Sequence, residues 1–469
     1  MAKGEEKSSV LMVSMAFQGH MNPMLRLAKI LNSKGVRVTL ATTEAVRHRM
    51  LKYNSNSTIN NINSDNNPNQ IELAFFSDGL SPDFDRVTYA EEFFLSLEAQ
   101  GPTNLSSLIG NLSRNDFSCM IINPFMPWAI DVAHKLGIPC AILWIQASAV
   151  YSIYYRYYKS INRFPNLEDP NGIVQLPGIP SLEVRELPSF MLPSSPPFIR
   201  TMLENIFESI DKVRWVFATS FDDFEEEIVK SMDSLIPIRS IGPLVSPFML
   251  GQKETNDLSV DMWGVDESCM GWLDEKPNSS VIYVSFGSII VLTQNQMDNI
   301  AMALKNSNKA FLWVIQESNP SGGSLSREFL EETKGRGMVV NWCPQEKVLM
   351  HPSIGCFVTH CGWNSMIEAV VAGLPMVAYP KWSDQAINTK LCISVFENGV
   401  RVNCGEDGVA RAEEVERCIR EVMEGPKGVE MKKKAMKMKE DARKAIEEGG
   451  SSNRNINMFI SELINNVGN

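Results

Sequence analysis

The chain has 469 residues, of which 55 are acidic and 44 are basic, so its net charge at pH 7 is −11. This length allows two or three domains of ordinary size, each with its own core. A protein this acidic lacks the general attraction to polyanions on which nucleic-acid and anionic-membrane binding depend. We therefore expect neither nucleic acid nor a membrane surface as a partner, and any anionic ligand must be held by local hydrogen-bond donors.

The nine cysteines are scattered along the chain, and no two of them have the Cys-x-x-Cys spacing of a zinc or redox site. This pattern indicates a reduced protein without a disulfide framework. The segment from Met1 to Lys7 is charged and lacks the apolar stretch of a signal peptide. No apolar run approaches the roughly 18 residues of a membrane span. We therefore expect a cytoplasmic protein.

The first half of the sequence alternates between apolar strands and amphipathic helices. The apolar run Val10–Met15 predicts a buried strand. Asn22 and Pro23 predict a helix start, because Asn is a good N-cap and Pro a good first helical residue. The alternation continues with predicted strands at 36–41, 119–122 and 140–144 and a predicted helix at 128–136. Such a pattern is typical of a doubly wound α/β sheet, which binds ligands at the carboxyl ends of its strands.

A second alternating unit follows a segment of Gly, Pro and polar residues at 242–259 that is typical of a linker. Its predicted elements are strands at 281–285, 311–315, 337–341 and 356–359 and a helix at 294–305. Two charged amphipathic helices are predicted at 413–424 and 428–448, and their mixture of acidic and basic residues favours solvated faces over membrane binding. A last helix is predicted at 455–464. The sequence therefore predicts two doubly wound units in one chain.

The segment Trp342–Gln385 contains the most informative pattern. A short polar turn, Gly362–Ser365, separates the predicted strand 356–359 from a helix. Backbone N–H groups at such a helix start point at a ligand above the strand, and the helix dipole favours an anion there. The side chains of His360 and Asn364 add further donors. These features predict a diphosphate site without a P-loop lysine.

In order and spacing this segment resembles the plant secondary-product glycosyltransferase box, the nucleotide-sugar signature of family-1 plant glucosyltransferases. The matching blocks are Trp342-Cys-Pro-Gln345, Thr359-His-Cys-Gly-Trp-Asn-Ser365 with Glu368, and Tyr379-Pro-Lys-Trp-Ser-Asp-Gln385, and the box spans 44 residues. The resemblance covers essentially the whole chain. It implies a GT-B fold, in which two Rossmann-like doubly wound domains face a cleft.

The resemblance also implies where the domains lie. It implies an N-terminal acceptor-binding domain at 1–244, an interdomain linker at 245–262 and a C-terminal UDP-sugar-binding domain at 263–450. A C-terminal helix at 451–469 is expected to pack back on the N-terminal domain. The implied activity is inverting transfer of glucose from UDP-glucose to a small-molecule acceptor, by a protein that we expect to be a monomer.

The resemblance further assigns roles to the residues of the donor site. Trp342 would stack on uracil, Gln345 would meet the ribose, and Glu368 would accept both ribose hydroxyls. The implied diphosphate contacts are Ser288, His360, Asn364 and Ser365, the implied sugar contacts are Trp363, Asp384 and Gln385, and Cys343 and Gly362 complete the donor-binding set. Gln at position 385 resembles the glucose-preferring version of the box.

The resemblance implies no metal and no cofactor. The leaving group is UDP, and fixed donors aimed at its developing charge can replace a metal ion. The sequence agrees, because no Asp-x-Asp metal motif sits at the end of a predicted strand.

The segment Gln18-Gly19-His20-Met21-Asn22-Pro23 follows the first predicted strand and resembles the family's catalytic-histidine motif. An imidazole at the carboxyl end of a strand can take a proton from an acceptor hydroxyl. Most family members carry an Asp after the strand at 119–122 that orients this histidine, and here Asn123 stands in its place. Asn can accept a hydrogen bond from the imidazole but adds no charge. Because a nearby carboxylate raises a histidine pKa by roughly 1–3 units, we expect His20 to be a weaker base than usual.

A weak base suffices when the acceptor is already ionised. A carboxylic acid has a pKa of about 4.3 and is an ionised nucleophile at neutral pH, whereas a simple phenol has a pKa of about 10. The sequence therefore favours carboxylic-acid acceptors and 1-O-acyl glucose esters. Several blocks, among them Phe75–Gly79 and Tyr154–Tyr158, resemble the plant subgroup that makes glucose esters of aromatic acids and auxin, which often lacks the Asp too. The alternative is O- or C-glucosylation of flavonoid or phenolic acceptors.

An apolar acceptor pocket is expected around His20. Its candidate lining residues are Phe17, Phe94, Phe125, Trp144 and Phe190, with Gln146 and Ser148 as polar guides. We expect Arg185 and Arg156 at the surface, with a contact to an acceptor carboxylate as the alternative for either.

Two other readings fit less of the sequence. A sugar-nucleotide-binding protein without catalysis is supported only by Asn123. A dinucleotide-dependent oxidoreductase would need a Gly-x-Gly-x-x-Gly turn after the first strand of a unit, and neither Ser14–Asn22 nor Ser285–Leu292 contains one.

Overall fold

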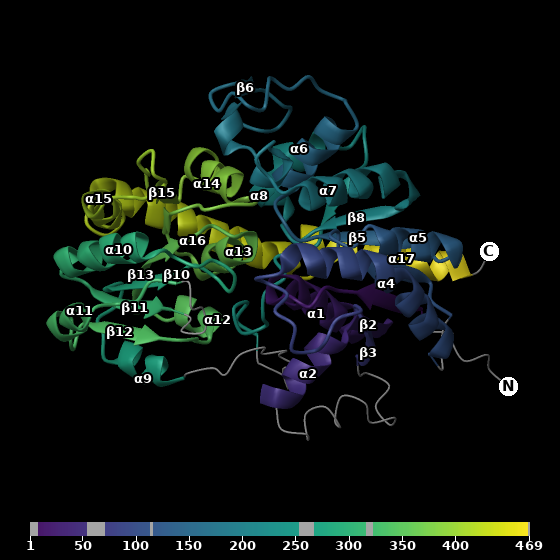
Figure 1. Cartoon of the computed structure of the whole chain (residues 1–469), viewed down its shortest axis with the longest axis horizontal. Helices are drawn as coiled ribbons and strands as arrows, with labels where there is room; N and C mark the ends of the chain where they lie inside the picture. Colours follow the sequence, from purple (N-terminus) through teal and green to yellow (C-terminus); the bar gives the residue numbers. More distant parts are fainter. Residues whose placement is uncertain (1–7, 54–70, 113–115, 253–266, 316–321, 468–469) are drawn as a thin grey trace.

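The structure is a computed structural model that describes residues 8–53, 71–112, 116–252, 267–315 and 322–467. Within these residues the chain forms two parallel sheets, one of seven strands and one of six, which lie in the right and left halves of the molecule (Figure 1). In spatial order the first sheet consists of β3 (Glu72–Phe76), β2 (Arg37–Thr43), β1 (Ser9–Val13), β4 (Cys119–Ile122), β5 (Cys140–Trp144), β8 (Trp215–Ala218) and β9 (Ile238–Ser240).

The second sheet has the same kind of arrangement. Its strands in spatial order are β12 (Gly337–Val340), β11 (Ala310–Val314), β10 (Val281–Ser285), β13 (Ile354–Thr359), β14 (Met376–Ala378) and β15 (Gly399–Arg401). A small antiparallel pair, β6 (Ile173–Val174) and β7 (Leu182–Glu183), stands apart from both sheets. The two doubly wound units predicted from the sequence are therefore confirmed.

Helices cover the faces of both sheets. Those of the first unit are α1 (Gln18–Ser33), α2 (Glu44–Tyr53), α4 (Ala90–Asn111), α5 (Trp128–Lys135), α6 (Ser148–Tyr158), α7 (Pro197–Ser209) and α8 (Asp222–Lys230), with the 3-10 turns η1 (Val184–Glu186), η2 (Ser189–Met191) and η3 (Ile210–Lys212). Those of the second unit are α9 (Ser268–Asp274), α10 (Gln294–Ser307), α11 (Arg327–Glu332), α12 (Gln345–Leu349), α13 (Trp363–Ala372), α14 (Gln385–Ser394), α15 (Ala412–Met423) and α16 (Pro426–Ile446). The last helix is α17 (Ser451–Val467).

The central strands are buried along their whole length, as their continuous apolar sequences predict. β1 lies between β2 and β4, with Val10 opposite Val38 on one side and Cys119 on the other. β10 lies between β11 and β13 in the same way. Because both neighbours of each central strand are parallel to it, the loops that follow these strands gather at one edge of each sheet.

The first helix begins earlier than its sequence suggests. The expectation of a helix start at Asn22-Pro23 was wrong, since α1 starts at Gln18 and contains Pro23. Proline has no N–H to donate to the carbonyl four residues before it, here that of Gly19. That carbonyl instead accepts a hydrogen bond of 2.8 Å from Nδ2 of Asn364 in the second unit. The proline is thus accommodated by a contact that joins the two units.

The two C-terminal helices connect the halves of the molecule. α16 packs against α13 of the second unit and against α8 of the first. α17 then lies against the edge of the first sheet (Figure 1). There the Phe459 ring packs edge-to-face on Trp215 and Phe217, and the Asn455 amide donates to the carbonyl of Ser240. α17 starts at Ser451, four residues before the predicted start, directly after Gly449-Gly450.

Two expectations concern parts of the chain that the structure covers only partly. Residues 1–7 and residues 253–262 of the expected linker lie outside the described residues.

Among the residues that the structure does cover, no helix is both long and apolar enough to span a membrane. The nine cysteines are free thiols, and all but Cys404 are buried.

Replacement of Phe459 by Ala tests the contact between α17 and the first sheet. The ring is 2% exposed and contacts two aromatic side chains, so its loss leaves a cavity and should lower the free energy of unfolding by about 3 kcal/mol in a urea titration. The neighbouring Met458 is 52% exposed, and Met458→Ala should have almost no effect. Equal effects of the two substitutions would contradict this packing.

Candidate functional site

A cavity of about 680 Å³ lies between α1 of the first unit and α12 and α13 of the second. From the second unit it is lined by Ser288, Trp342, Cys343, Gln345, Asn364, Ser365 and Glu368. From α1 it is lined by Gln18, Gly19, Asn22 and Arg26. The structure thus brings together most of the residues expected to contact uracil, ribose and diphosphate. His360, Gly362, Trp363, Asp384 and Gln385 do not line this cavity.

A chain of hydrogen bonds organises the end of the cavity expected to hold the ribose. The Tyr283 hydroxyl donates to Oε1 of Gln345 at 3.0 Å, and Nε2 of Gln345 donates to Oε2 of Glu368 at 2.7 Å. The same Nε2 lies 3.1 Å from Oγ of Ser365. The carboxylate of Glu368 and the amide of Gln345 are therefore held at the cavity wall in fixed orientations.

Arg26 is a residue of this site that the sequence analysis missed. Its guanidinium forms an ion pair with Glu346, lies 3.8 Å from Oε1 of Glu368 and donates to the carbonyl of Leu244 at 2.8 Å. A sequence signal existed, because Gln18, Asn22 and Arg26 follow one another at intervals of four and so share one face of α1. All three line the cavity.

The charge state of Glu368 depends on these neighbours. Burial, followed by the nearby charge of Glu346, raises the pKa of its carboxyl group from 4.5 to about 7, while Arg26 and the hydrogen bond from Gln345 act in the opposite direction. A group that is half protonated near neutral pH sits where two ribose hydroxyls are expected to bind.

The start of α13 has the geometry that anion binding requires. Gly362 is its N-cap residue, and no side chain caps the helix, so its first N–H groups remain available to a ligand. A Cβ atom on Gly362 would come within 2.4 Å of Nε2 of His360, and one on Gly287 within 2.8 Å of Cε1 of the same ring. The imidazole of His360 is thus packed between two glycines. Burial lowers its pKa to about 4, so the ring is neutral at pH 7.

Two of the residues expected at the sugar, Asp384 and Gln385, lie where the loop after β14 enters α14, and the third, Trp363, is the first residue of α13. Asp384 is buried and accepts a hydrogen bond of 2.8 Å from Asn388, and burial raises the pKa of its carboxyl group. The Gln385 side chain accepts from the backbone N–H groups of Lys381 and Trp382. The Trp363 indole is buried and donates to Thr219 of the first unit at 3.0 Å, so a sugar contact by Trp363 would have to come from its backbone.

His20 and Asn123 lie side by side although they are far apart in the sequence. Nδ1 of His20 is 3.1 Å from Oδ1 of Asn123, and this oxygen also accepts the backbone N–H of Phe125 at 3.2 Å. The second bond fixes the amide with its oxygen toward the imidazole. Nδ1 of His20 must therefore carry the proton, which leaves Nε2 as the proton acceptor.

The imidazole of His20 is held neutral mainly by its surroundings. Burial lowers its pKa from 6.5 to about 4, and the hydrogen bond to Asn123 raises it only in part. The rings of Phe17 and Phe125 lie 5.9 and 5.4 Å from the imidazole. The sequence analysis expected a weak base because Asn123 is uncharged, and it did not anticipate burial, which is the larger cause.

A row of aromatic rings extends from His20. Phe17 contacts Phe93, Phe93 contacts Phe94 and Phe94 contacts Phe198, with ring centroids 5.3 to 5.7 Å apart. Phe17 and Phe94 were expected near an acceptor, whereas Phe93 and Phe198 were not identified. Phe190, another expected lining residue, lies against Trp382 of the second unit at 5.3 Å.

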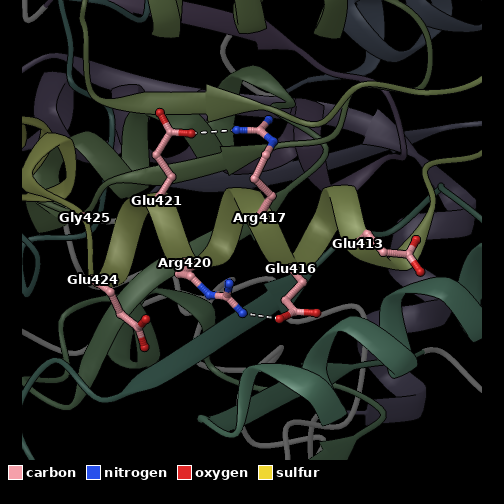
Figure 2. Close-up of a pocket in the computed structure, with 7 residues that line it drawn as sticks. All are labelled: Glu413, Glu416, Arg417, Arg420, Glu421, Glu424 and Gly425. Carbon is pink, nitrogen blue, oxygen red and sulfur yellow. Dashed lines mark hydrogen bonds and ion pairs between the residues drawn. The ribbon is translucent and has the colours of Figure 1, made fainter.

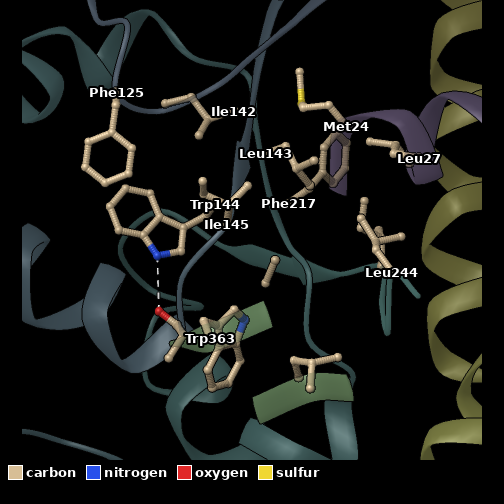
Figure 3. Close-up of a cluster of buried hydrophobic side chains, with 14 of the residues drawn as sticks. Met24, Leu27, Phe125, Ile142, Leu143, Trp144, Ile145, Phe217, Leu244 and Trp363 are labelled. Carbon is tan, nitrogen blue, oxygen red and sulfur yellow. Dashed lines mark hydrogen bonds between the residues drawn. The ribbon is translucent and has the colours of Figure 1, made fainter. Parts of the chain in front are cut away.

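Two expectations about the acceptor pocket need correction. Trp144 does not line a pocket: its ring is fully buried against Tyr151, and its indole donates to the carbonyl of Ala147 (Figure 3). Ser148 is also buried, and its backbone N–H donates to the carboxyl group of Glu225. The end of β5 points Trp144 into the core, and the start of α6 does the same for Ser148.

The two arginines considered for a carboxylate contact are engaged elsewhere. Arg185 is exposed and pairs with Glu183, as expected for a surface residue. Arg156 is 5% exposed, which makes the expectation of a surface position wrong. It donates to Ser152, Asn162 and the carbonyl of Ser231, so it stabilises the end of α6.

A separate hollow on α15 has a different character. It is lined by Glu413, Glu416, Arg417, Arg420, Glu421, Glu424 and Gly425 (Figure 2). Its arginines pair with acidic residues four positions away, Arg417 with Glu421 and Arg420 with Glu416. Such pairs are ordinary on the solvent face of a helix.

Nowhere in the part of the chain that the structure covers do three or more His, Cys, Asp or Glu side chains gather in a way that could hold a metal ion.

Two doubly wound units with a polar cavity at the start of α13 define a glycosyltransferase of the GT-B type that uses a sugar nucleotide. The family model described as "UDP-glucoronosyl and UDP-glucosyl transferase" matches residues 252–441. With relatives that match almost the whole chain at up to 47% identity, the chain belongs to this family of UDP-glycosyltransferases.

Three similar proteins illustrate the relationship. UDP-glycosyltransferase 84B2 from Arabidopsis thaliana is 47% identical over 454 residues, which cover 96% of this chain and 99% of the relative. Gallate 1-beta-glucosyltransferase from Quercus robur is 40% identical over 463 residues, covering 97% and 89% of the two chains. The crystal structure of Os79 from O. sativa in complex with UDP has a TM-score of 0.84 and 32% identity, covering 97% and 100%. The expected family and GT-B fold are confirmed.

The Arg26–Glu368 pair predicts how donor affinity depends on pH. Since an ionised carboxylate accepts ribose hydroxyls better than a carboxylic acid, UDP should bind more weakly as the pH falls below the pKa of Glu368, about 7. Arg26→Leu removes a charge that lowers this pKa and should move the midpoint upward by about one unit. Calorimetric titration with UDP between pH 5.5 and 9 measures both midpoints.

Arg26→Lys is the matched control, because it keeps the positive charge and should keep the midpoint near that of the unmodified protein. Identical pH profiles for the unmodified protein and Arg26→Leu would contradict the assigned role of Arg26.

Proposed function

We propose that this UDP-glycosyltransferase transfers glucose from UDP-glucose to the carboxylate of a small, flat, apolar plant metabolite and forms a 1-O-acyl glucose ester. The observation that carries the proposal is the uncharged pair of His20 and Asn123, in which Asn123 is fully buried and His20 is partly buried. A carboxylate oxygen attacks the anomeric carbon from the face opposite UDP, so the configuration at that carbon inverts.

The lining of the cavity suits one orientation of the donor. Uracil stacks on Trp342, the ribose hydroxyls donate to Glu368 beside Gln345, and the diphosphate lies at the start of α13 with Asn364, Ser365 and Ser288. The sugar then lies toward Asp384 and Gln385. The negative charge that develops on departing UDP is stabilised by N–H groups that are already oriented.

Proton transfer distinguishes the two acceptor classes. The conjugate acid of His20 has a pKa of about 4, and a simple phenol has a pKa of about 10. Transfer of the phenol proton to His20 is therefore strongly unfavourable, because the phenol is a much weaker acid than the protonated imidazole. A carboxylic acid has already lost its proton at pH 7, so its reaction does not need this step.

The absence of a charge on Asn123 also favours a carboxylate acceptor. An Asp beside His20 would place a buried negative charge next to an anionic acceptor and would repel it. Asn123 keeps the imidazole oriented through its oxygen and adds no such charge. The substitution therefore weakens the base and at the same time removes a repulsion.

Aromatic residues near His20 suit a flat acceptor. Phe17 and Phe94 are partly buried and are joined through the fully buried Phe93 into a row that begins beside the imidazole. Aromatic side chains such as Phe17 and Phe94 pack well against another aromatic ring. The relative from Quercus robur is named for gallate, an aromatic carboxylate, and it is 40% identical over 97% of this chain.

A matched set of acceptors tests the proposal. UDP release from UDP-glucose should be at least 100-fold faster with cinnamate or indole-3-acetate than with a phenol of similar size, because only the acids are ionised at pH 7. The products with the acids should be cleaved by mild alkali, as esters are. Fast turnover of phenols alone, with alkali-stable products, would replace ester formation by O- or C-glucosylation of phenolic acceptors.

Substitutions of His20 and Asn123 make this test more specific. His20→Ala should lower kcat/KM for an acid less than tenfold, because the imidazole accepts no proton from it. It should lower any activity on phenols by about 100-fold or more, the contribution of general-base catalysis. Asn123→Asp should shift the preference toward phenols, by strengthening the base and repelling carboxylates. Equal losses on both acceptor classes in His20→Ala would count against the proposed chemistry.

A further inference from the structure

Two segments from different units meet beside the residues expected at the sugar. The strap, residues 182–192, belongs to the first unit and contains β7, η1 and η2. The sugar loop, residues 380–384, follows β14 of the second unit and leads into α14, which begins at Gln385. The strap and the sugar loop are in contact, although almost two hundred residues separate them in the sequence.

The contact is a reciprocal pair of hydrogen bonds between two serines. The backbone N–H of Ser383 donates to Oγ of Ser189 at 2.7 Å, and the backbone N–H of Ser189 donates to the carbonyl of Ser383 at 2.8 Å. The hydroxyl of Ser383 in turn accepts Nε2 of Gln146 at 3.4 Å. Every polar group of Ser383 is thus bonded to the first unit.

Ser383 needs this support because its backbone is strained. Its φ angle is +61°, in the left-handed region that residues other than glycine rarely adopt. The next residue, Asp384, is the N-cap residue of α14, and Gln385 is the first residue of that helix. The backbone angle at Ser383 therefore sets the direction in which both sugar-contact side chains leave the loop.

The strap is itself fixed to the second unit by other contacts. Lys390 of α14 and Arg401 of β15 lie 3.2 and 3.7 Å from the carboxyl group of Glu186, which is 8% exposed. The Phe190 ring packs edge-to-face on Trp382 at 5.3 Å. These contacts hold the strap in place without the Ser189 hydroxyl, so the hydroxyl can act specifically on the sugar loop.

We propose that Ser189 is a positioning residue for the donor sugar, through which the first unit sets how tightly and how selectively the second unit holds the hexose. Ser189 does not touch the donor; it holds Ser383 in the conformation that aims Asp384 and Gln385. The inference rests on the proposed function, because it takes Asp384 and Gln385 as the sugar contacts.

Ser189→Ala tests the proposal, since it removes the acceptor for the Ser383 N–H and keeps the reverse backbone bond. The loss of one such hydrogen bond should weaken UDP-glucose binding about fivefold. The dissociation constant of UDP, which lacks the sugar, should stay the same. The preference in kcat/KM for UDP-glucose over UDP-galactose should fall by a similar factor. Calorimetry with UDP and UDP-glucose and initial rates with both sugar nucleotides measure these effects.

Two variants serve as controls. Ser189→Thr keeps a hydroxyl and should restore the ratio of the UDP-glucose and UDP dissociation constants to that of the unmodified protein. Ser194 is exposed on the chain just beyond the strap, and Ser194→Ala should leave that ratio unchanged.

The outcomes separate this proposal from the one on which it rests. If Ser189→Ala weakens UDP as much as UDP-glucose, or changes neither, the sugar-specific role of Ser189 is wrong while the proposed transfer still stands. If the unmodified protein does not turn over UDP-glucose with any acid or phenol, the proposed function fails, and the ratio of the two dissociation constants still decides whether Ser189 acts on the sugar.

Discussion

The hydrogen bond from Asn364 to the carbonyl of Gly19 joins the two halves of the active site. It connects the first turn of α13, where the diphosphate is expected, to the first turn of α1, which carries His20. The bond gives the Gly19 carbonyl a partner in place of its helical one, because Pro23 has no N–H to donate to it. The residue before Asn364 makes a second bond between the same two units, from the Trp363 indole to Thr219. The proton acceptor and the donor-binding helix are therefore held as one structure.

Burial dominates the electrostatics of this structure. It lowers the pKa values of His20 and His360 to about 4 and raises those of Glu368 and Asp384. The groups around the cleft are thus pushed toward their neutral forms. An acidic protein can then bind a doubly charged donor, because oriented N–H groups and amides do the binding and few like charges oppose it.

Much of the fold and of the donor site could be predicted because the relevant signals are local. Apolar runs identified the central strands, and the box from Trp342 to Gln385 placed its residues on the consecutive elements α12, β13, α13 and β14 and the start of α14. The proximity of His20 and Asn123 followed from strand order, since both residues come after neighbouring strands of the first sheet. Trp144 and Arg156 were misjudged, because apolar or charged character does not reveal which way a residue on a fully buried element points.

Contacts between the units could not be read from local patterns. Ser189 and Ser383 are unremarkable in sequence, and their pairing depends on how the strap crosses from one sheet to the other. The packing of the His20 ring was also not anticipated, since it involves Phe125 from a segment distant in the sequence as well as the nearby Phe17. Arg26 is an intermediate case, because its face of α1 was predictable but its partner Glu346 was not.

The most direct test of the account is the charge state of His20 itself. In an NMR titration of isotope-labelled histidines from pH 8 to pH 5, assigned with His20→Gln, we expect the His20 ring to remain neutral with its proton on Nδ1. In Asn123→Asp the His20 midpoint should move up into this range. A His20 midpoint at or above 6.5 in the unmodified protein would contradict the weak-base account and with it the preference for carboxylate acceptors.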